Sequence, residues 1–174
     1  MAETPKATLT RLEAMLIREP ARAEFEAQAL LRREPGNGRA ALVLGSARRR
    51  RGDLVGSARA LVALAKAHPH LVEAQLELAV VLLALGEHDS GTERLGHAVD
   101  LDPALAEAWL EDAVASDPSD TTLRLALADA LYRQGKPAAA IGHLGQLLAR
   151  DASAPGPVTL MAACQALMSE DLRE

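Results

Sequence analysis

The side chains best suited to chemistry in this 174-residue chain are two histidines, His68 and His70, and a single cysteine, Cys164. Imidazole nitrogens ligate zinc, and a thiolate is a strong nucleophile. No cysteine or clustered carboxylate completes a ligand set near His68-Pro69-His70, and Cys164 lies among alanines. No nucleophile elbow, phosphate loop or HExxH motif is present. The sequence therefore predicts no catalytic residue, no cofactor and no metal site, and it favours a loop for the histidines and a packed thiol for Cys164.

Four consecutive arginines, Arg48 to Arg51, form the most concentrated charge in the chain. They could contact an anion or an acidic peptide. Alternatively, they lie at a helix C-terminus, where the helix dipole favours cations. A run of four covers all sides of a helix, so its spacing alone favours the second interpretation.

Composition and net charge argue against some classes of binding partner. The net charge of −5 and the pI near 5.6 argue against general affinity for nucleic acid or an anionic membrane. One cysteine forms no internal disulfide, which fits a reducing cytoplasm. The N-terminus lacks a basic start followed by an apolar core, and the longest apolar run, 79–85, is too short to cross a bilayer. We therefore expect a cytoplasmic protein.

The rest of the chain repeats the pattern of one segment, Leu71–Pro103, which reads LVEAQLELAVVLLALGEHDSGTERLGHAVDLDP. It has the pattern of two helices joined at a glycine and closed by a proline. Its landmarks recur at a spacing of 34 residues, in the sets Pro35, Pro69 and Pro103; Gly52 and Gly86; Leu44 and Leu78; Gly45 and Ala79; and Leu61 and Leu95. A small residue is needed where the two helices cross closely, and glycine is needed where the first helix ends in a left-handed turn.

Further along the chain the spacing changes. Gly86 and Gly135 are 49 residues apart, which is 34 plus the 15 residues between Pro103 and Pro118. A short segment, 104–118, is therefore inserted before the next complete unit. Its first half, LAEAWLE, matches the start of a first helix, and its second half, EDAVASDP, matches the end of a second helix. We predict one helix there instead of two, which should interrupt the regular stacking of the array.

A helix–turn–helix period of 34 residues resembles the tetratricopeptide repeat family. The resemblance implies an all-α fold, an α-α superhelix of helical hairpins, with one unpaired helix at 104–115. The predicted parts of this single domain are an N-terminal helical cap (8–34), repeat 1 (38–71), repeat 2 (72–103), a truncated repeat (104–118), repeat 3 (121–152) and a C-terminal helix (157–168). In the cap, Phe25, Leu30 and Leu31 are expected to point inward.

In this family the first helix of each repeat lines a concave groove that binds a protein or peptide. When the groove positions of the family are transferred to this sequence, the groove would include Arg39, Leu42, Ser46, Arg49, Glu73, Leu76, Val80, Thr122, Leu125 and Asp129. The asparagine and lysine positions that grip acidic C-terminal tails in some relatives are not matched. More weakly, residues 20–53 resemble the repeat array ahead of bacterial sulfotransferase domains, although the chain has no phosphosulfate-binding loop.

Three hypotheses of function follow. The first is a non-enzymatic scaffold that binds a peptide or helix in its groove. The second is a self-associating module, a homodimer formed through Met161, Leu167 and Met168 on the last helix, which no following helix covers. The third is an accessory array for a sulfotransferase-type enzyme. Trp109 is expected to fill the core beside the truncated repeat, with a binding hot spot as the alternative.

Overall fold

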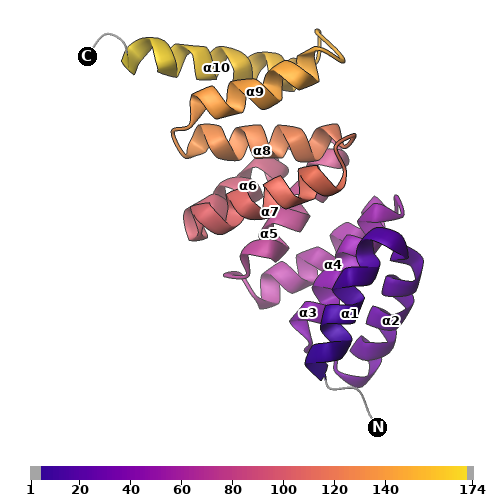
Figure 1. The fold of residues 1–174 in the computed structure, drawn as a ribbon. Helices are drawn as coiled ribbons and strands as arrows, with labels where there is room; N and C mark the ends of the chain where they lie inside the picture. Colours follow the sequence, from indigo (N-terminus) through magenta and orange to yellow (C-terminus); the bar gives the residue numbers. More distant parts are fainter. Residues whose placement is uncertain (1–4, 172–174) are drawn as a thin grey trace. The chain divides into compact units, whose positions relative to one another are not determined.

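The computed structural model describes residues 5–171, and this part of the chain contains ten helices and no strand (Figure 1). The fold is therefore all-α, as predicted. The helices are α1 (Pro5–Arg18), α2 (Pro20–Arg33), α3 (Gly38–Arg50), α4 (Leu54–Ala67), α5 (Val72–Ala84), α6 (His88–Leu101), α7 (Pro103–Ser116), α8 (Thr121–Arg133), α9 (Pro137–Leu148) and α10 (Pro155–Asp171).

The helices form two compact units that divide within α6, the first ending at Arg94 and the second beginning at Leu95. In the first unit each helix packs on the next, from α1 to α5, and the alternate helices α1, α3 and α5 also contact one another in sequence. The α1–α2 pair therefore packs on α3 as the other helices of the unit pack on their neighbours, and its role as a cap stays a prediction. In the second unit, α7 to α10 pack in series, and α8 also contacts α10.

Three of the first helices end in the same glycine turn. Gly52, Gly86 and Gly135 have φ angles of 82°, 82° and 70°, in the left-handed region that favours glycine. After α3, the Gly52 amide donates to the Arg49 carbonyl and the Asp53 amide donates to the Arg48 carbonyl, both at 2.9 Å. This Schellman pattern recurs after α5 and α8 and satisfies the last carbonyls of each helix. The predicted turns are confirmed.

The first and second helices of repeat 1 meet at Gly45. A Cβ built on this residue would lie 2.5 Å from Leu61 Cγ, so no side chain fits while Leu61 keeps its position. The hydroxyl of Ser57, on the second helix, donates to the Gly45 carbonyl at 2.7 Å. Ala79 and Ala128 occupy the corresponding positions of the other repeats and are fully buried. The predicted close crossing is confirmed.

Two apolar clusters hold the first unit together. One joins the cap to repeat 1 and contains Leu12, Ala23, Ala27, Val43, Leu44 and Ala47. The other joins α4 to α5 and contains Leu61, Leu64, Ala65, Ala74, Leu78, Val81 and Leu82. Burial of this apolar surface is the main stabilising term, because short isolated helices are marginal in water.

The inward position predicted for Phe25 is wrong, since its side chain is 67% exposed. On α2 the core-facing residues are Ala23 and Ala27, one helical turn apart, and both are fully buried. Phe25 is two residues from each, about 200° around a helix of 3.6 residues per turn, so it faces away from the core. Leu30 and Leu31 pack against the cluster as expected.

The last helix is longer than the predicted 157–168 at both ends, because it begins at Pro155 and ends at Asp171. Prolines usually break a helix, yet the first turn tolerates them, since its amide groups have no partner within the helix. Pro155 and Pro157 both lie in that turn, and Pro157 is buried.

One helix, α7, occupies the truncated segment, as predicted. The Asp102 side chain caps its N-terminus by accepting from the Leu105 amide at 2.9 Å, and Pro103 takes the first helical position. It packs on α8, the next helix along the chain. Trp109, on α7, is half-buried. The interrupted stacking and the domain boundaries of the array stay predictions.

Candidate partner-binding surface

A buried polar network joins the first helices of repeats 1 and 2. Glu77, on α5, accepts from the Ser46 hydroxyl at 2.7 Å and from Arg49 Nε at 2.9 Å, both on α3. The side chains of Arg49 and Glu77 are only 8% and 6% exposed. A buried ion pair requires such complementary hydrogen bonds, because each charge loses its hydration. The network therefore ties α3 to α5 and is not free to bind a partner.

Several of the predicted groove residues are accordingly inaccessible. Leu76 is 0%, Val80 1% and Ser46 4% exposed. Almost every residue of α5 is buried, including Val72 and the run from Ala74 to Leu82, so this helix has no solvated face along its middle. In the first unit, Arg39 is exposed, while Leu42 and Glu73 are half-buried. Within the first unit, these three residues are the accessible part of the predicted groove, and partner binding there stays a prediction.

In the second unit, the predicted groove residues Thr122, Leu125 and Asp129 lie on α8 and are half-buried. Asp129 accepts from Arg133 Nε at 3.0 Å, one turn along the helix. Leu125 reaches α10, since a Cβ built on Gly156 would lie 3.2 Å from its Cδ2. These positions remain a prediction for partner binding.

The arginine run makes ion pairs within the molecule. Arg48 Nε donates to Glu24 Oε1 at 3.1 Å, Arg51 also pairs with Glu24, and Arg49 pairs with Glu77. Burial raises the pKa of Glu24, but the hydrogen bonds from the two arginines outweigh burial, so the pKa lies below its usual value. The arginines thus hold α3 against α2 and α5, which supports a structural role over an anion site.

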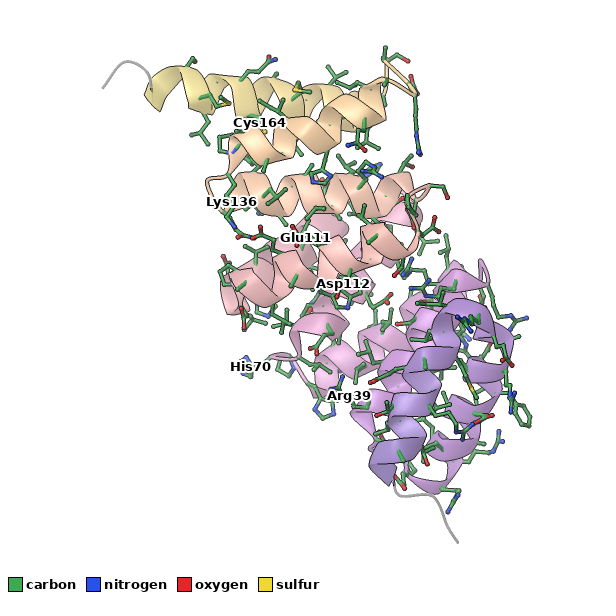
Figure 2. All side chains as sticks on the ribbon, viewed as in Figure 1. Arg39, His70, Glu111, Asp112, Lys136 and Cys164 are labelled. Atoms are coloured by element: carbon green, nitrogen blue, oxygen red, sulfur yellow. The ribbon has the colours of Figure 1, made fainter. Side chains whose placement is uncertain are left out.

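Cys164 lies on α10 and is fully buried (Figure 2). Burial raises the pKa of its thiol, and the charge of Asp129 adds to the effect. A thiol with a raised pKa is a poor nucleophile, so the packed-thiol interpretation is supported. Within residues 5–171, no group of three or more His, Cys, Asp or Glu side chains is placed to hold a metal ion. No helix of this part is long and apolar enough to cross a membrane.

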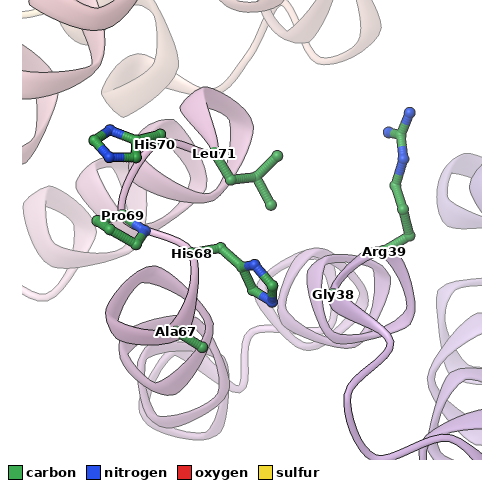
Figure 3. Close-up of a pocket in the computed structure, with 7 residues that line it drawn as sticks. All are labelled: Gly38, Arg39, Ala67, His68, Pro69, His70 and Leu71. Carbon is green, nitrogen blue, oxygen red and sulfur yellow. The ribbon is translucent and has the colours of Figure 1, made fainter.

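A hollow of about 530 Å³ in the first unit has no signal in the sequence pattern. It lies between the N-terminus of α3 and the loop from α4 to α5, and it is lined by Gly38, Arg39, Ala67, His68, Pro69, His70 and Leu71 (Figure 3). Arg39 was predicted to line the groove, whereas the two histidines were predicted to lie in a loop. Only the packing of α3 on α4 shows that they share one surface.

The repeated antiparallel helix pairs, with a small residue at each crossing and a glycine turn after each first helix, define a helical-repeat protein. The family model for the tetratricopeptide repeat matches residues 102–164. The upstream repeats, which this match does not cover, have the 34-residue period that is typical of the same family. The matched model describes the tetratricopeptide repeat and not the arrays that precede sulfotransferase domains, so the resemblance to those arrays stays a prediction.

Several solved structures are similar to this chain at low identity. A tetratricopeptide repeat protein from Parabacteroides merdae is 16% identical, with 97% of this chain and 75% of that chain covered and a TM-score of 0.48. A thermophilic repeat protein of Thermus thermophilus is 19% identical, with 92% and 79% covered and a TM-score of 0.48. A chain of the APC/C hetero-tetramer Cut9–Hcn1 is 15% identical at a TM-score of 0.49, and this chain spans 37% of its length. No curated protein matches the sequence.

Proposed function

We propose that the chain is a non-enzymatic scaffold that binds a peptide or helix of a partner protein on its first-helix face. Tetratricopeptide repeats generally bind protein partners, and the match of residues 102–164 to this family supports a role of that kind. The observation that carries the proposal is the lateral contact of α3 with α5, which places Leu42 and Glu73 on neighbouring first helices. Both side chains are half-buried and so reach the surface.

The proposal can be tested with peptides that the purified protein selects from a displayed random library. We expect Leu42→Glu to weaken their binding about tenfold or more, because a charge replaces apolar contact area in the groove. The matched control is Val62→Glu, on α4, whose side chain is 51% exposed on a second helix. Leu76 is unsuitable, since a charge at a fully buried position would disrupt folding. Unchanged affinity of Leu42→Glu would sink the proposal.

A second candidate, self-association, is favoured by one observation on α10. Residues 152–169 contain no charged side chain, so most of α10 presents an uncharged surface. Val158 and Met168 are 44% and 37% exposed, while Met161 and Leu167 are half-buried. Light scattering over a concentration series tests this candidate. A dimer that becomes monomeric in Val158→Glu and Met168→Glu would support it, and a wild-type monomer at every concentration would exclude it.

A further inference from the structure

The contact between α8 and α9 contains a buried arginine that lacks an acidic partner. Arg124 of α8 is 8% exposed, and its guanidinium donates to the Gln146 side chain of α9 at 2.7 Å and to the Pro118 carbonyl at 3.0 Å. Both acceptors are neutral, and no carboxylate of the described residues forms an ion pair with Arg124. A second positive charge beside such a group is costly, because the buried surroundings screen it poorly.

His143 lies on α9, one helical turn before Gln146, and is half-buried. Its Nδ1 atom is shielded from solvent and has no hydrogen-bond partner. In the neutral ring the proton can reside on Nε2, so that Nδ1 presents only a lone pair to its packed surroundings. An imidazolium has a proton on both nitrogens, so protonation would place an N–H donor where no acceptor is available. The geometry therefore favours the neutral ring.

The charged groups that act on His143 come from two other helices. Arg124 of α8 opposes protonation, whereas Glu111, an exposed residue of α7, favours it (Figure 2). α9 has no other titratable side chain, and the charged residues of α10, Glu170 and Asp171, lie in its last turn. Burial has the largest effect, and with the charge of Arg124 it outweighs Glu111, so the pKa of His143 lies below its usual value.

Other ionisable side chains on the two helices that contact α9 keep their charge near neutral pH. Asp129 and Arg133 of α8 pair with each other at 3.0 Å. Burial raises the pKa of the Cys164 thiol of α10, which is therefore neutral. Histidine is the side chain whose charge ordinarily changes between pH 5 and pH 8. His143 is thus the group at this contact that responds to mild acid.

We propose that His143 is a proton-operated switch, which lets α9 pack on α8 at neutral pH and loosens this packing as the pH falls toward 5.5. Protonation places a second positive charge beside Arg124 and a donor without an acceptor in the contact. Because α10 packs on α9, the two C-terminal helices loosen together. The switch acts within the second unit and does not depend on the groove proposed at Leu42.

Nuclear magnetic resonance of the His143 ring measures its titration directly. At low ionic strength, the pH midpoint of the Cε1 proton should lie below that of a short peptide with the sequence of residues 139–147. Glu111→Gln should lower the midpoint further, because it removes the favourable charge from an exposed side chain. A midpoint at or above that of the peptide, or a midpoint that Glu111→Gln leaves unchanged or raises, would overturn the proposal.

Urea unfolding at pH 7.5 and pH 5.5 measures the effect on stability, with the fluorescence of Trp109 as a reporter in the second unit. The folded-state pKa is the lower one, so the stabilisation is complete above the unfolded-state pKa of about 6.5 and is lost as the pH falls toward the folded-state pKa. Between the two pH values, the unfolding equilibrium constant should rise about three- to tenfold more in the wild type than in His143→Gln.

The matched control is His88→Gln, which removes an exposed imidazole from α6 and should keep the wild-type pH dependence. Cys164 supplies a separate readout for α10, because its thiol is fully buried. Its rate of disulfide exchange, relative to the unfolded chain at the same pH, should rise about three- to tenfold from pH 7.5 to pH 5.5 in the wild type but not in His143→Gln. Equal pH dependence of His143→Gln and wild type, or a constant relative rate in the wild type, would overturn the switch.

Discussion

Arg49 Nε donates to Glu77 Oε2 at 2.9 Å across the contact between α3 and α5, and both side chains are nearly excluded from solvent. One repeat period after Arg49 the chain has Leu83, so the pair does not recur in the next repeat. It sets one first helix against the next. Arg49 therefore has a structural role, whereas its position in the repeat predicted a contact in the groove.

Removing one partner of this pair should be more harmful than removing both. We expect Glu77→Leu or Arg49→Met alone to destabilise the protein by about 3–5 kcal/mol, since each leaves an unpaired buried charge. The double variant should be markedly more stable than either single variant, because apolar side chains of similar size then fill the space. Urea unfolding followed by circular dichroism measures this difference. Additive losses in the double variant would show that the two charges are solvated independently.

Gly45 should be intolerant of even one added methyl group. The Cβ of Gly45→Ala would overlap Leu61, so we expect a loss of about 1–3 kcal/mol in the free energy of unfolding. Gly142, within α9, is the matched control, since a Cβ there meets nothing within 4 Å. Gly142→Ala should stabilise the protein by up to about 1 kcal/mol through helix propensity alone. Equal melting-temperature shifts for the two variants would contradict the close helix crossing.

The Glu24 carboxylate should make stability depend on pH. Its pKa is lowered in the folded protein, so the stabilisation is fully present above the unfolded-state pKa of about 4.3 and is lost as the pH falls through the folded pKa. Glu24→Gln should therefore cost about 1–2 kcal/mol at pH 7, through weaker hydrogen bonds to Arg48 and Arg51. The gap from wild type should narrow at pH 3.5. A constant gap in unfolding free energy at both pH values would argue against the ion pairs.

Cys164 should be protected from thiol reagents in the folded state. The side chain is fully buried and its pKa is raised, so both access and thiolate formation are reduced. We expect modification by a disulfide-exchange reagent at pH 8 to be slower by at least about a hundredfold than in denaturant, and to follow local opening of α10. Rapid modification of the folded protein would instead identify an accessible, activated thiol.

The helices and their repeat period could be predicted from the sequence alone. Each depends on local signals, such as the glycines that allow a left-handed turn at Gly52, Gly86 and Gly135, and the acidic caps Asp53, Asp102 and Asp120. These signals act within a few residues of the chain, so their spacing can be read directly. The single helix in the truncated segment followed from the same spacing.

The tertiary structure decided which side chains remain accessible. The resemblance to the family predicted a binding groove that includes Leu76, Val80, Ser46 and Arg49, yet these side chains are buried. Their accessibility depends on neighbours that are distant in the sequence. Phe25 was assigned to the core by its apolarity, but the rotation of α2 is set by Ala23 and Ala27. The shared surface of Arg39, His68 and His70 likewise required the packing of α3 against α4. Local sequence specifies where helices begin and end, whereas contacts across the fold specify the surface that a partner meets.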